Sequence, residues 1–313
     1  MTTVDEKIKV MVMCRYHYGK PAPFITDQIA ALEKDGCVAT LFNTEGDGIM
    51  GYVKAYFRMR SAIKSLKPDI IHAHYGMTGL LANFQRRVPV VTTYHGSDIN
   101  LSKVRKLSQM SMRLSAFNIF VSRKNVEQAG AKSKYELIPC GVDTSVFHKM
   151  DKAEARAKMN LPMDGKLVLF AGAFDVSIKN ADLAKAAMAN VENATLIELK
   201  GYSREEVAVL LNAVDCMLMT SKSEGSPQIV KEAIATGCPI VSVDVGDVKE
   251  RINGLNNCVI ADRNPQSIAE AVKSVIDNGQ RIKSGEEKIK AEGLDNEGVA
   301  RKIVSIYKKV IGK

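Results

Sequence analysis

The sequence contains no tryptophan, and aromatic residues make up only 6% of its 313 positions. Proteins that bind single-stranded nucleic acid stack the bases on aromatic side chains placed among basic ones. This chain offers few such positions, although its formal net charge is +9. We therefore expect no nucleic-acid partner.

Long apolar segments are also absent. No stretch approaches the roughly 20 apolar residues that a membrane-spanning helix needs, and the first residues, M-T-T-V-D-E-K, contain no apolar signal core. The six cysteines form no C-x-x-C pair, which favours reduced thiols over a disulfide framework or a zinc site. These features predict a cytoplasmic protein. The cysteines are Cys14, Cys37, Cys140, Cys216, Cys238 and Cys258.

The sequence has no D-x-D pair, and its His and Asp residues form no cluster at metal-ligand spacing. We therefore expect no metal ion and no cofactor in the chemistry of this chain.

The residues that are present have the composition of a soluble protein, with 46% hydrophobic and 25% charged positions over a length that suggests two domains. The charge is uneven. Residues 1–148 hold 20 Lys and Arg against 12 Asp and Glu, a net charge of +8, whereas residues 149–313 carry +1. The basic half indicates an anionic partner, and the basic amphipathic segment 51–67 would suit an anionic membrane surface. The alternative is that this segment packs on the core and exposes a solvated basic face.

Short apolar runs alternate with amphipathic segments along the whole chain, a pattern that predicts α/β domains with parallel sheets. The expected strands span residues 8–14, 37–42, 70–74, 90–94, 117–121, 136–139, 167–171, 195–199, 216–220 and 239–243. The expected helices span residues 25–34, 51–67, 76–87, 102–115, 152–159, 181–189, 203–212, 228–235, 267–277 and 297–311.

One glycine pattern, Gly46-x-Gly48-x-x-Gly51, nominally matches a dinucleotide-binding fingerprint. It follows the second strand rather than the first, and Glu45 and Asp47 would bring negative charge to a pyrophosphate. We interpret it as a flexible glycine loop.

The segment 221–250 carries the most specific signal. Glu224, Gly225 and Pro227 interrupt the apolar run that precedes them, and Ser226 can act as the N-cap of a helix over residues 228–235. Gly237 then ends that helix, and residues 239–243 form a buried strand.

This arrangement predicts an anion site, because the first amides of a helix and its dipole favour a phosphate. The amides of Gln228 and Ile229 would face the phosphate. Glu224 in the turn and Glu232 within the helix are ionised acceptors that suit sugar hydroxyls. Amides for phosphate and carboxylates for sugars together indicate a nucleotide-sugar site.

Glu224-x7-Glu232, set within S-x-x-E-G-x-P and E-A-x-A-x-G-x-P-I-V, resembles the signature of the retaining family 4 glycosyltransferases. The resemblance implies the GT-B fold: two Rossmann-like domains that face each other across a cleft, with a C-terminal helix that crosses back to the N-terminal domain. It implies an acceptor-side domain over residues 1–148, completed by a helix at about 297–313, and a donor domain over residues 149–296.

The resemblance also assigns roles outside this segment. The strand-end sequence T-x-Y-H-G-S-D carries over His95, which lines the reacting side, and Asp98. The glycine near the donor corresponds to Gly19, and the donor domain supplies Gly172 and Lys179. Lys179 would bind the diphosphate together with Gly225, Ser226, Pro227 and the amides that follow. Ala173 stands where the family usually has a second cation, Arg.

The activity that the resemblance implies is retaining, metal-independent transfer of a hexosyl group from a nucleotide-sugar donor to a glycan or lipid-linked acceptor. Such a reaction would serve the synthesis of cell-surface polysaccharide or glycolipid, with the protein in the cytoplasm or peripheral at the inner face of the membrane. His95 and Glu224 are the expected catalytic residues. Two alternatives are a non-catalytic sugar-binding or scaffolding relative, which Ala173 favours, and a nucleotide-sugar epimerase.

Overall fold

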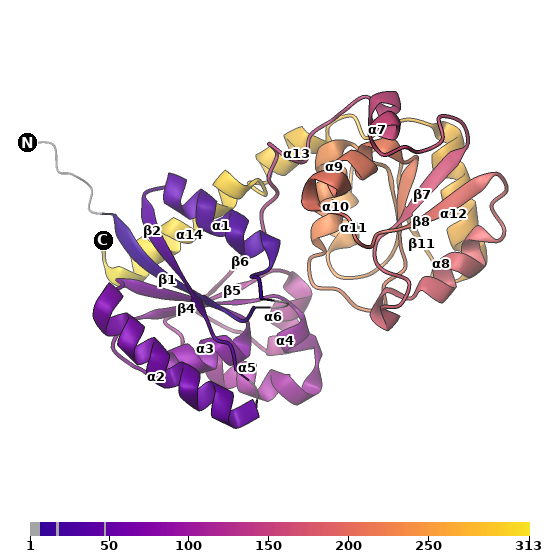
Figure 1. Cartoon of the computed structure of the whole chain (residues 1–313). Coiled ribbons are helices and arrows are strands. Elements are labelled where there is room, and N and C mark those ends of the chain that lie inside the picture. The colour runs from indigo at the N-terminus through magenta and orange to yellow at the C-terminus, as the bar shows by residue number, and fades with distance from the viewer. Residues whose placement is uncertain (1–6, 17–18, 47) are drawn as a thin grey trace, which may run out of the picture. The chain divides into compact units, whose positions relative to one another are not determined.

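The structure is a computed structural model that describes residues 7–16, 19–46 and 48–313. The chain folds into two compact units, each with its own sheet and core (Figure 1). Unit 1 runs to Gly141 and resumes at Asn296, and unit 2 spans Val142–Asp295. This division lies a few residues before the boundary expected at 148/149. The reason is that the amide of Val142 donates to the carbonyl of Leu294 at 2.8 Å, and Phe147 is buried in the core of unit 2.

Unit 1 is built on a parallel sheet of six strands in the order β2-β1-β3-β4-β5-β6 among the described residues. The strands are β1 Ile8–Cys14, β2 Cys37–Asn43, β3 Ile70–His74, β4 Val90–Tyr94, β5 Phe117–Phe120 and β6 Tyr135–Leu137. Strands β3 and β4 are buried along their whole length, as expected for central strands covered by helices on both faces.

The helices of unit 1 cover both faces of this sheet. They are α1 Pro23–Lys34, α2 Gly48–Leu66, α3 Gly76–Asn83, α4 Ser97–Asn100, α5 Ser102–Leu114, α6 Arg123–Ala129 and α14 Asn296–Ile311. Helices α1 and α14 pack together on one face, and α2, α3 and α5 cover the other (Figure 1). The expected return of the last helix to the N-terminal domain is therefore confirmed, and Ile303 and Tyr307 of α14 are buried in the core with β1 and β3.

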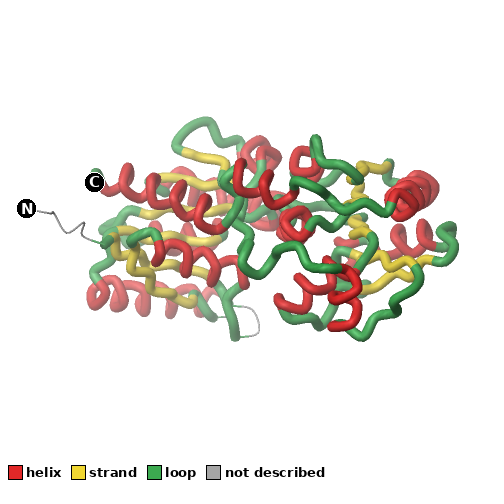
Figure 2. Tube along the Cα trace, turned by 90° about the horizontal axis from the view of Figure 1, so that it is seen from above, coloured by secondary structure: helices red, strands yellow, loops and turns green. Residues whose placement is uncertain are grey.

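Unit 2 repeats the architecture with a five-stranded parallel sheet in the order β11-β10-β9-β7-β8. Figure 2 shows the strands of each unit lying between helices. The strands are β7 Lys166–Phe170, β8 Ala194–Glu198, β9 Cys216–Met219, β10 Ile240–Val243 and β11 Cys258–Ala261. The helices are α7 Lys152–Lys158, the 3₁₀ turn η1 Ser177–Lys179, α8 Ala181–Met188, α9 Arg204–Ala213, α10 Gln228–Thr236, α11 Val248–Ile252, α12 Pro265–Asn278 and α13 Gly285–Ala291.

The two sheets share one topology. Counted from the first strand of each unit, both begin in the order 2-1-3-4-5, and the direction of strand addition reverses between the first and third strands. Open α/β sheets bind ligands outside the carboxyl ends of their strands at this reversal point. In unit 1 the point lies between β1 and β3, and in unit 2 it lies between β7 and β9.

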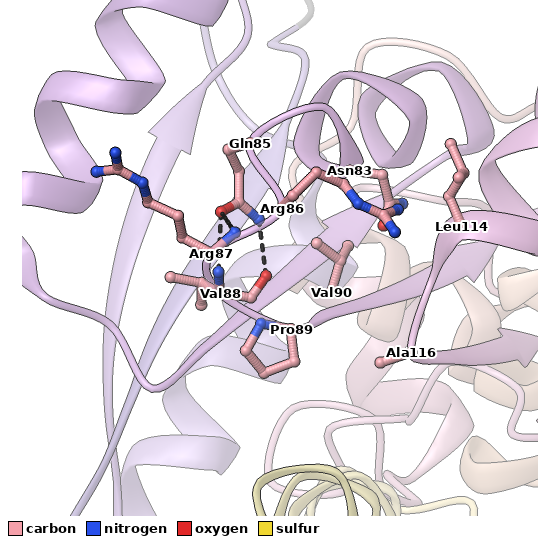
Figure 3. Close-up of a pocket in the computed structure, with 9 residues that line it drawn as sticks. All are labelled: Asn83, Gln85, Arg86, Arg87, Val88, Pro89, Val90, Leu114 and Ala116. Carbon is pink, nitrogen blue, oxygen red and sulfur yellow. Dashed lines mark hydrogen bonds between the residues drawn. The ribbon is translucent and has the colours of Figure 1, made fainter.

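The end of one helix differs from its prediction. Helix α3 ends at Asn83 rather than at residue 87, because the side chain of Gln85 accepts the amides of Arg87 and Val88 and donates to the carbonyl of Val88 (Figure 3). This turn lines a cavity of about 170 Å³ at the amino ends of β4 and β5, opposite the ligand-binding edge. The side chains of Arg86 and Arg87 point away from each other there, so they do not converge on one anion (Figure 3).

Gly46 precedes α2 and lies close to Gly51 within that helix. A Cβ on Gly46 would lie 2.5 Å from the Cα of Gly51, so two backbones meet where side chains would clash. Within the described residues, we find no helix that has both the length and the hydropathy needed to cross a bilayer.

Candidate functional site

The reversal point of unit 2 brings together residues that are widely spaced in the sequence. Gly172 follows β7, Lys179 ends η1, and Glu224 lies in the loop between β9 and α10. The Nζ atom of Lys179 lies 2.7 Å from Oε1 of Glu224. Both side chains are partly exposed, so this ion pair is accessible to a ligand from the carboxyl edge of the sheet.

The backbone around Lys179 is held by the neighbouring strand. The hydroxyl of Thr220 donates to the carbonyls of Lys179 and Asn180 at 3.1 and 3.0 Å, and the amide of Lys222 donates to the carbonyl of Ile178 at 2.8 Å. These bonds fix the η1 turn against the end of β9. The backbone that carries the Lys179 side chain is therefore fixed, which reduces the conformational entropy lost when this side chain binds an anion.

Gly172 is a glycine because Lys179 passes over it. A Cβ at position 172 would lie 2.7 Å from Cγ and 3.0 Å from Cδ of Lys179, both in the stem of that side chain. We predict that Gly172→Ala weakens the binding of nucleoside diphosphates by displacing Lys179, with little loss of fold stability, because Gly172 does not occupy the left-handed region. Calorimetric titration with UDP measures this effect.

The matched control for that prediction is Lys179→Ala combined with Gly172→Ala. If the glycine acts through Lys179, the double variant binds UDP no more weakly than Lys179→Ala alone. Additive losses would contradict the prediction.

The turn that begins α10 differs from the predicted cap. The N-cap of α10 is Pro227, without a side-chain cap, and the helix begins at Gln228. The prediction that Ser226 caps the helix is wrong, because its hydroxyl instead donates to Oδ2 of Asp247 at 2.8 Å. Gly246 lies against the turn so closely that a Cβ there would approach the carbonyl oxygen of Gly225 to 2.6 Å.

The remaining predicted residues of this segment lie on α10. Gln228 and Ile229 form its first turn and are half-buried, and Glu232 is half-buried one turn further along the helix. Helix α10 ends at Gly237, whose φ of +73° is the left-handed C-cap conformation that the sequence predicted.

Sequence reasoning missed a buried charged network behind this turn. Lys231 is fully buried, and its Nζ lies 3.3 Å from the hydroxyl of Ser226. Asp247 accepts from Ser226 and, at 3.2 Å, from Nε of Arg251. Burial raises the pKa of Asp247, and Lys231, Ser226 and Arg251 each act in the opposite direction. Lysine near the start of a helix opposes the helix dipole, and that unfavourable placement was the available signal.

In unit 1, His95 and Asp98 lie together at the carboxyl end of β4. Oδ1 of Asp98 accepts the amides of His95 and Gly96 at 3.1 and 3.0 Å, and Oδ2 accepts the amide of Gly76 at 2.9 Å. The carboxylate thus joins the turn after β3 to the turn after β4 and fixes the backbone of His95. Gly19 lies after β1, on the other side of β3, in a turn that its φ of +74° requires to be glycine.

Asp98 gives a prediction about pH. Burial raises its pKa to about 6, and the three backbone amides act in the opposite direction. The folded state therefore binds a proton more readily than the unfolded state, so stability falls as pH rises from about 4 to about 6, by about 3 kcal/mol in total. We expect Asp98→Asn to remove this slope, measured as the difference in urea midpoint between variant and parent from pH 4 to 7. Parallel curves for the two proteins would contradict it.

The described residues contain no group of three or more His, Cys, Asp or Glu side chains arranged to hold a metal ion. None of the six cysteines, all of which lie among the described residues, forms a disulfide bond.

Two family models match the chain in succession, one for each unit. The model described as Glycosyltransferase Family 4 matches residues 10–146, and the model described as Glycosyl transferases group 1 matches residues 166–278. Two Rossmann-like units, each matched by a glycosyltransferase model, define a glycosyltransferase of the GT-B class. The chain belongs to the family 4, group 1 glycosyltransferases.

Individual proteins agree with this assignment. The chain is 28% identical over 262 residues to the putative teichuronic acid biosynthesis glycosyltransferase TuaC of Bacillus subtilis, which covers 72% of this chain and 67% of that protein. Sucrose-phosphate synthase from Thermosynechococcus elongatus has the same fold, with a TM-score of 0.83 at 16% identity over 98% of this chain and 100% of that one. Anabaena HepE, solved in complex with UDP, has a TM-score of 0.75 at 16% identity over 96% and 100% of the two chains.

Proposed function

We propose that this protein is a retaining, metal-independent glycosyltransferase that moves a hexosyl group from a nucleotide-sugar donor to a glycan or lipid-linked acceptor. The observation that carries the proposal is the Lys179–Glu224 pair at 2.7 Å, placed at the reversal point of the unit 2 sheet. A diphosphate would take Lys179 as its cation, and sugar hydroxyls would take Glu224 as their acceptor. One ligand that has both groups is a nucleotide sugar.

The chemistry follows from the charges of these groups. When the bond between the anomeric carbon and the diphosphate oxygen breaks, negative charge develops on the leaving group, and Lys179 and the first amides of α10 stabilise it. Glu224 would orient the sugar and Glu232 the ribose. The acceptor hydroxyl would attack from the face that the diphosphate leaves, and its proton would pass to the leaving oxygen. This front-face route needs no protein nucleophile and retains the configuration.

Metal independence rests on the same groups. Enzymes that use a divalent cation do so to neutralise the diphosphate, and here a fixed ammonium and a helix start take that place. Full turnover in excess EDTA is the expected result, and strict dependence on Mn²⁺ would contradict this part of the proposal.

The first test is thermal protection by a panel of UDP-, GDP- and ADP-sugars, with NAD included. UDP-sugars come first because HepE was solved with UDP. A ligand at 100 times its Kd adds about 2.7 kcal/mol, which corresponds to several degrees for units of this size. We expect protection by one nucleotide class, lost in Lys179→Ala. Protection by NAD alone would contradict a nucleotide-sugar site.

A second candidate function is donor binding without transfer. Ala173, at the position where the family usually has arginine, favours it, because one cation for the diphosphate is missing. Protection by a nucleotide sugar, without release of the sugar to any glycan or lipid acceptor, would support this candidate. A sugar product still attached to its nucleotide would instead indicate an epimerase.

We also propose that unit 1 docks on an anionic membrane surface, where a lipid-linked acceptor would be found. The sequence suggested α2 for this role, and the structure exposes apolar side chains on both α2 and α5, which flank α3 on one face of the sheet (Figure 1). Phe57 and Leu101 are 62% and 60% exposed. We call these residues and their neighbours the apolar–basic surface. Its apolar members are Met50, Val53, Phe57, Phe84, Leu101, Leu107, Met110 and Leu114, and its lysines include Lys54, Lys64, Lys103 and Lys106.

The core-packing interpretation of α2 describes one stripe of the helix, and the membrane interpretation stays a proposal. Ala55 and Met59 are buried in the core of unit 1, so the helix is packed on the sheet, whereas Phe57 points to solvent. A helix that buries one stripe and exposes apolar residues beside lysines has the pattern of an interfacial helix.

Sedimentation with vesicles that contain phosphatidylglycerol tests the docking surface. We expect binding at low salt that is lost in the double variant Phe57→Ser/Leu101→Ser. Met163 is 57% exposed on unit 2, so Met163→Ser is the matched control and should leave sedimentation unchanged. No sedimentation of the parent protein would refute membrane docking without affecting the proposed transfer reaction.

A further inference from the structure

Three imidazole rings form a stack beneath the predicted catalytic histidine. His72 and His74 are two residues apart along β3 and therefore project from the same face of the sheet. The rings of His72 and His74 are 4.6 Å apart at 17°, and those of His74 and His95 are 5.2 Å apart at 21°. His72 and His74 are fully buried, whereas His95 is half-buried. The stack thus runs from the core of unit 1 to the site at the end of β4.

The inner ring has a fixed tautomer. The amide nitrogen of Gln28 lies 3.3 Å from Nδ1 of His72 and can only donate, so Nδ1 is an acceptor. The hydroxyl of Tyr307 lies 2.5 Å from the same nitrogen, and Nε2 of His72 lies 2.7 Å from the hydroxyl of Thr93. His72 is therefore neutral, with its proton on Nε2 donated to Thr93, and it makes no hydrogen bond to His74.

The middle ring has a single hydrogen-bond partner among the described residues. Nδ1 of His74 lies 2.9 Å from Nε2 of His95, and Nε2 of His74 is buried without a partner in that part of the chain. Burial lowers the pKa of His74 to about 3, so the ring is neutral near pH 7. A proton on Nε2 would be a buried donor without an acceptor, a group that folded proteins rarely contain. The proton therefore lies on Nδ1, which donates to His95.

This donation determines the tautomer of the outer ring. Since Nε2 of His95 accepts from His74, neutral His95 carries its proton on Nδ1. That atom lies 3.7 Å from the sulfur of Cys140, a weak acceptor that a substrate oxygen can replace. Phe24 and Tyr75 pack on His95 with ring centroids 4.8 and 4.6 Å away, so the imidazole has little freedom to turn over.

We propose that His74 is a positioning residue that holds His95 in the Nδ1–H tautomer, so that His95 serves the reaction as a hydrogen-bond donor and not as a proton acceptor. The role of His95 in turnover rests on the proposed function, whereas its tautomer does not. A hydrogen-bond donor at this place suits an oxygen of the transferred sugar or of the leaving group. It also agrees with a front-face route in which the leaving oxygen, and not a protein base, takes the acceptor's proton.

The tautomer is read directly from long-range ¹⁵N–¹H spectra of the full chain, which has five histidines. We expect His95 with Nδ1 protonated and Nε2 in the chemical-shift range of an acceptor. This measurement needs neither a nucleotide sugar nor turnover, so it tests the inference even if the proposed transfer reaction fails. His95 with its proton on Nε2 would overturn the proposal.

Variants then separate positioning from packing. His74→Leu fills similar volume without a donor. We expect it to shift His95 toward the Nε2–H tautomer and to lower kcat about 10- to 100-fold, the loss seen when residues that orient metal-bound histidines are removed. KM for the nucleotide sugar that the thermal panel selects should change little. His74→Asn places an amide N–H near the original Nδ1 and should restore both the tautomer and most of kcat.

His148 provides the matched control, because it is exposed and lies in unit 2. His148→Asn should leave the His95 signals and turnover unchanged. If His74→Asn and His74→Leu lose turnover equally while the His95 tautomer stays the same, His74 has only a packing role and the proposal is wrong. If His74→Leu does not fold, the spectrum of the parent protein still decides the tautomer.

Discussion

Replacing Glu224 by Gln should lower kcat/KM for the nucleotide sugar about 100-fold and at the same time tighten the binding of UDP alone. Turnover falls because hydrogen bonds to a charged acceptor are about twice as strong as those to a neutral one, and the amide loses that advantage toward sugar hydroxyls. UDP binds more tightly because Lys179 no longer has the carboxylate 2.7 Å away as a competing partner. Steady-state kinetics and calorimetry measure the two effects separately.

The opposite directions make this prediction specific. Lys179→Ala removes the cation and should weaken both UDP binding and turnover. Glu205→Gln changes an exposed carboxylate on α9 and should alter neither, so it is the control for the change of net charge. Unchanged turnover in Glu224→Gln would remove Glu224 from the donor site and would favour the non-catalytic candidate.

Replacing Lys231 by Met should destabilise unit 2 by about 3–5 kcal/mol, the range measured when one charge of a buried charged network is removed, because Lys231 is fully buried and its charge lowers the pKa of the buried Asp247. The substitution leaves Asp247 buried beside Ser226, with Arg251 as the cation that remains in the network. For a unit of this size the loss corresponds to a fall in Tm of about 6–20 °C, which calorimetry can follow.

The direction of the pH dependence adds a second test. The pKa of Asp247 is already raised by burial, and loss of Lys231 raises it further. The variant should therefore lose more stability than the parent protein as pH rises, because Asp247 must ionise with Arg251 as its one remaining cation in the network. Asp247→Asn in the Lys231→Met background should recover part of the loss. The exposed Lys222 supplies the control, and Lys222→Met should stay within about 0.5 kcal/mol of the parent. Equal losses in the two lysine variants would contradict the prediction.

Much of this fold could be predicted from the sequence, because buried parallel strands are short apolar runs and their helices repeat with a different period. Strands β1, β3 and β4 begin and end at the predicted residues. Strand β11, the four residues C-V-I-A, was missed, although β9 and β10 are no longer. Helix α3 was predicted too long because the turn formed by the Gln85 side chain has no signature in a pattern of apolar residues.

The candidate site divides in the same way. Turn chemistry and the Glu224-x7-Glu232 spacing could predict a candidate donor edge, because they depend on residues close together in the chain. The role of Ser226 was misjudged, since its partner Asp247 is 21 residues away on another loop. The stack of His72, His74 and His95 could not be seen for the same reason: its geometry depends on which strands are neighbours in the sheet.

The placement of α14 has a consequence for how the chain is made. Unit 2 lies wholly inside the sequence of unit 1, and the core of unit 1 includes Val299, Ile303 and Tyr307, which follow unit 2 in the chain and are therefore synthesised after it. The domain that is begun first is therefore completed last. During translation unit 2 can bury its full core while β1 still lacks the helix that covers it, so a stop codon between unit 2 and α14 would leave unit 1 without that helix and unit 2 folded.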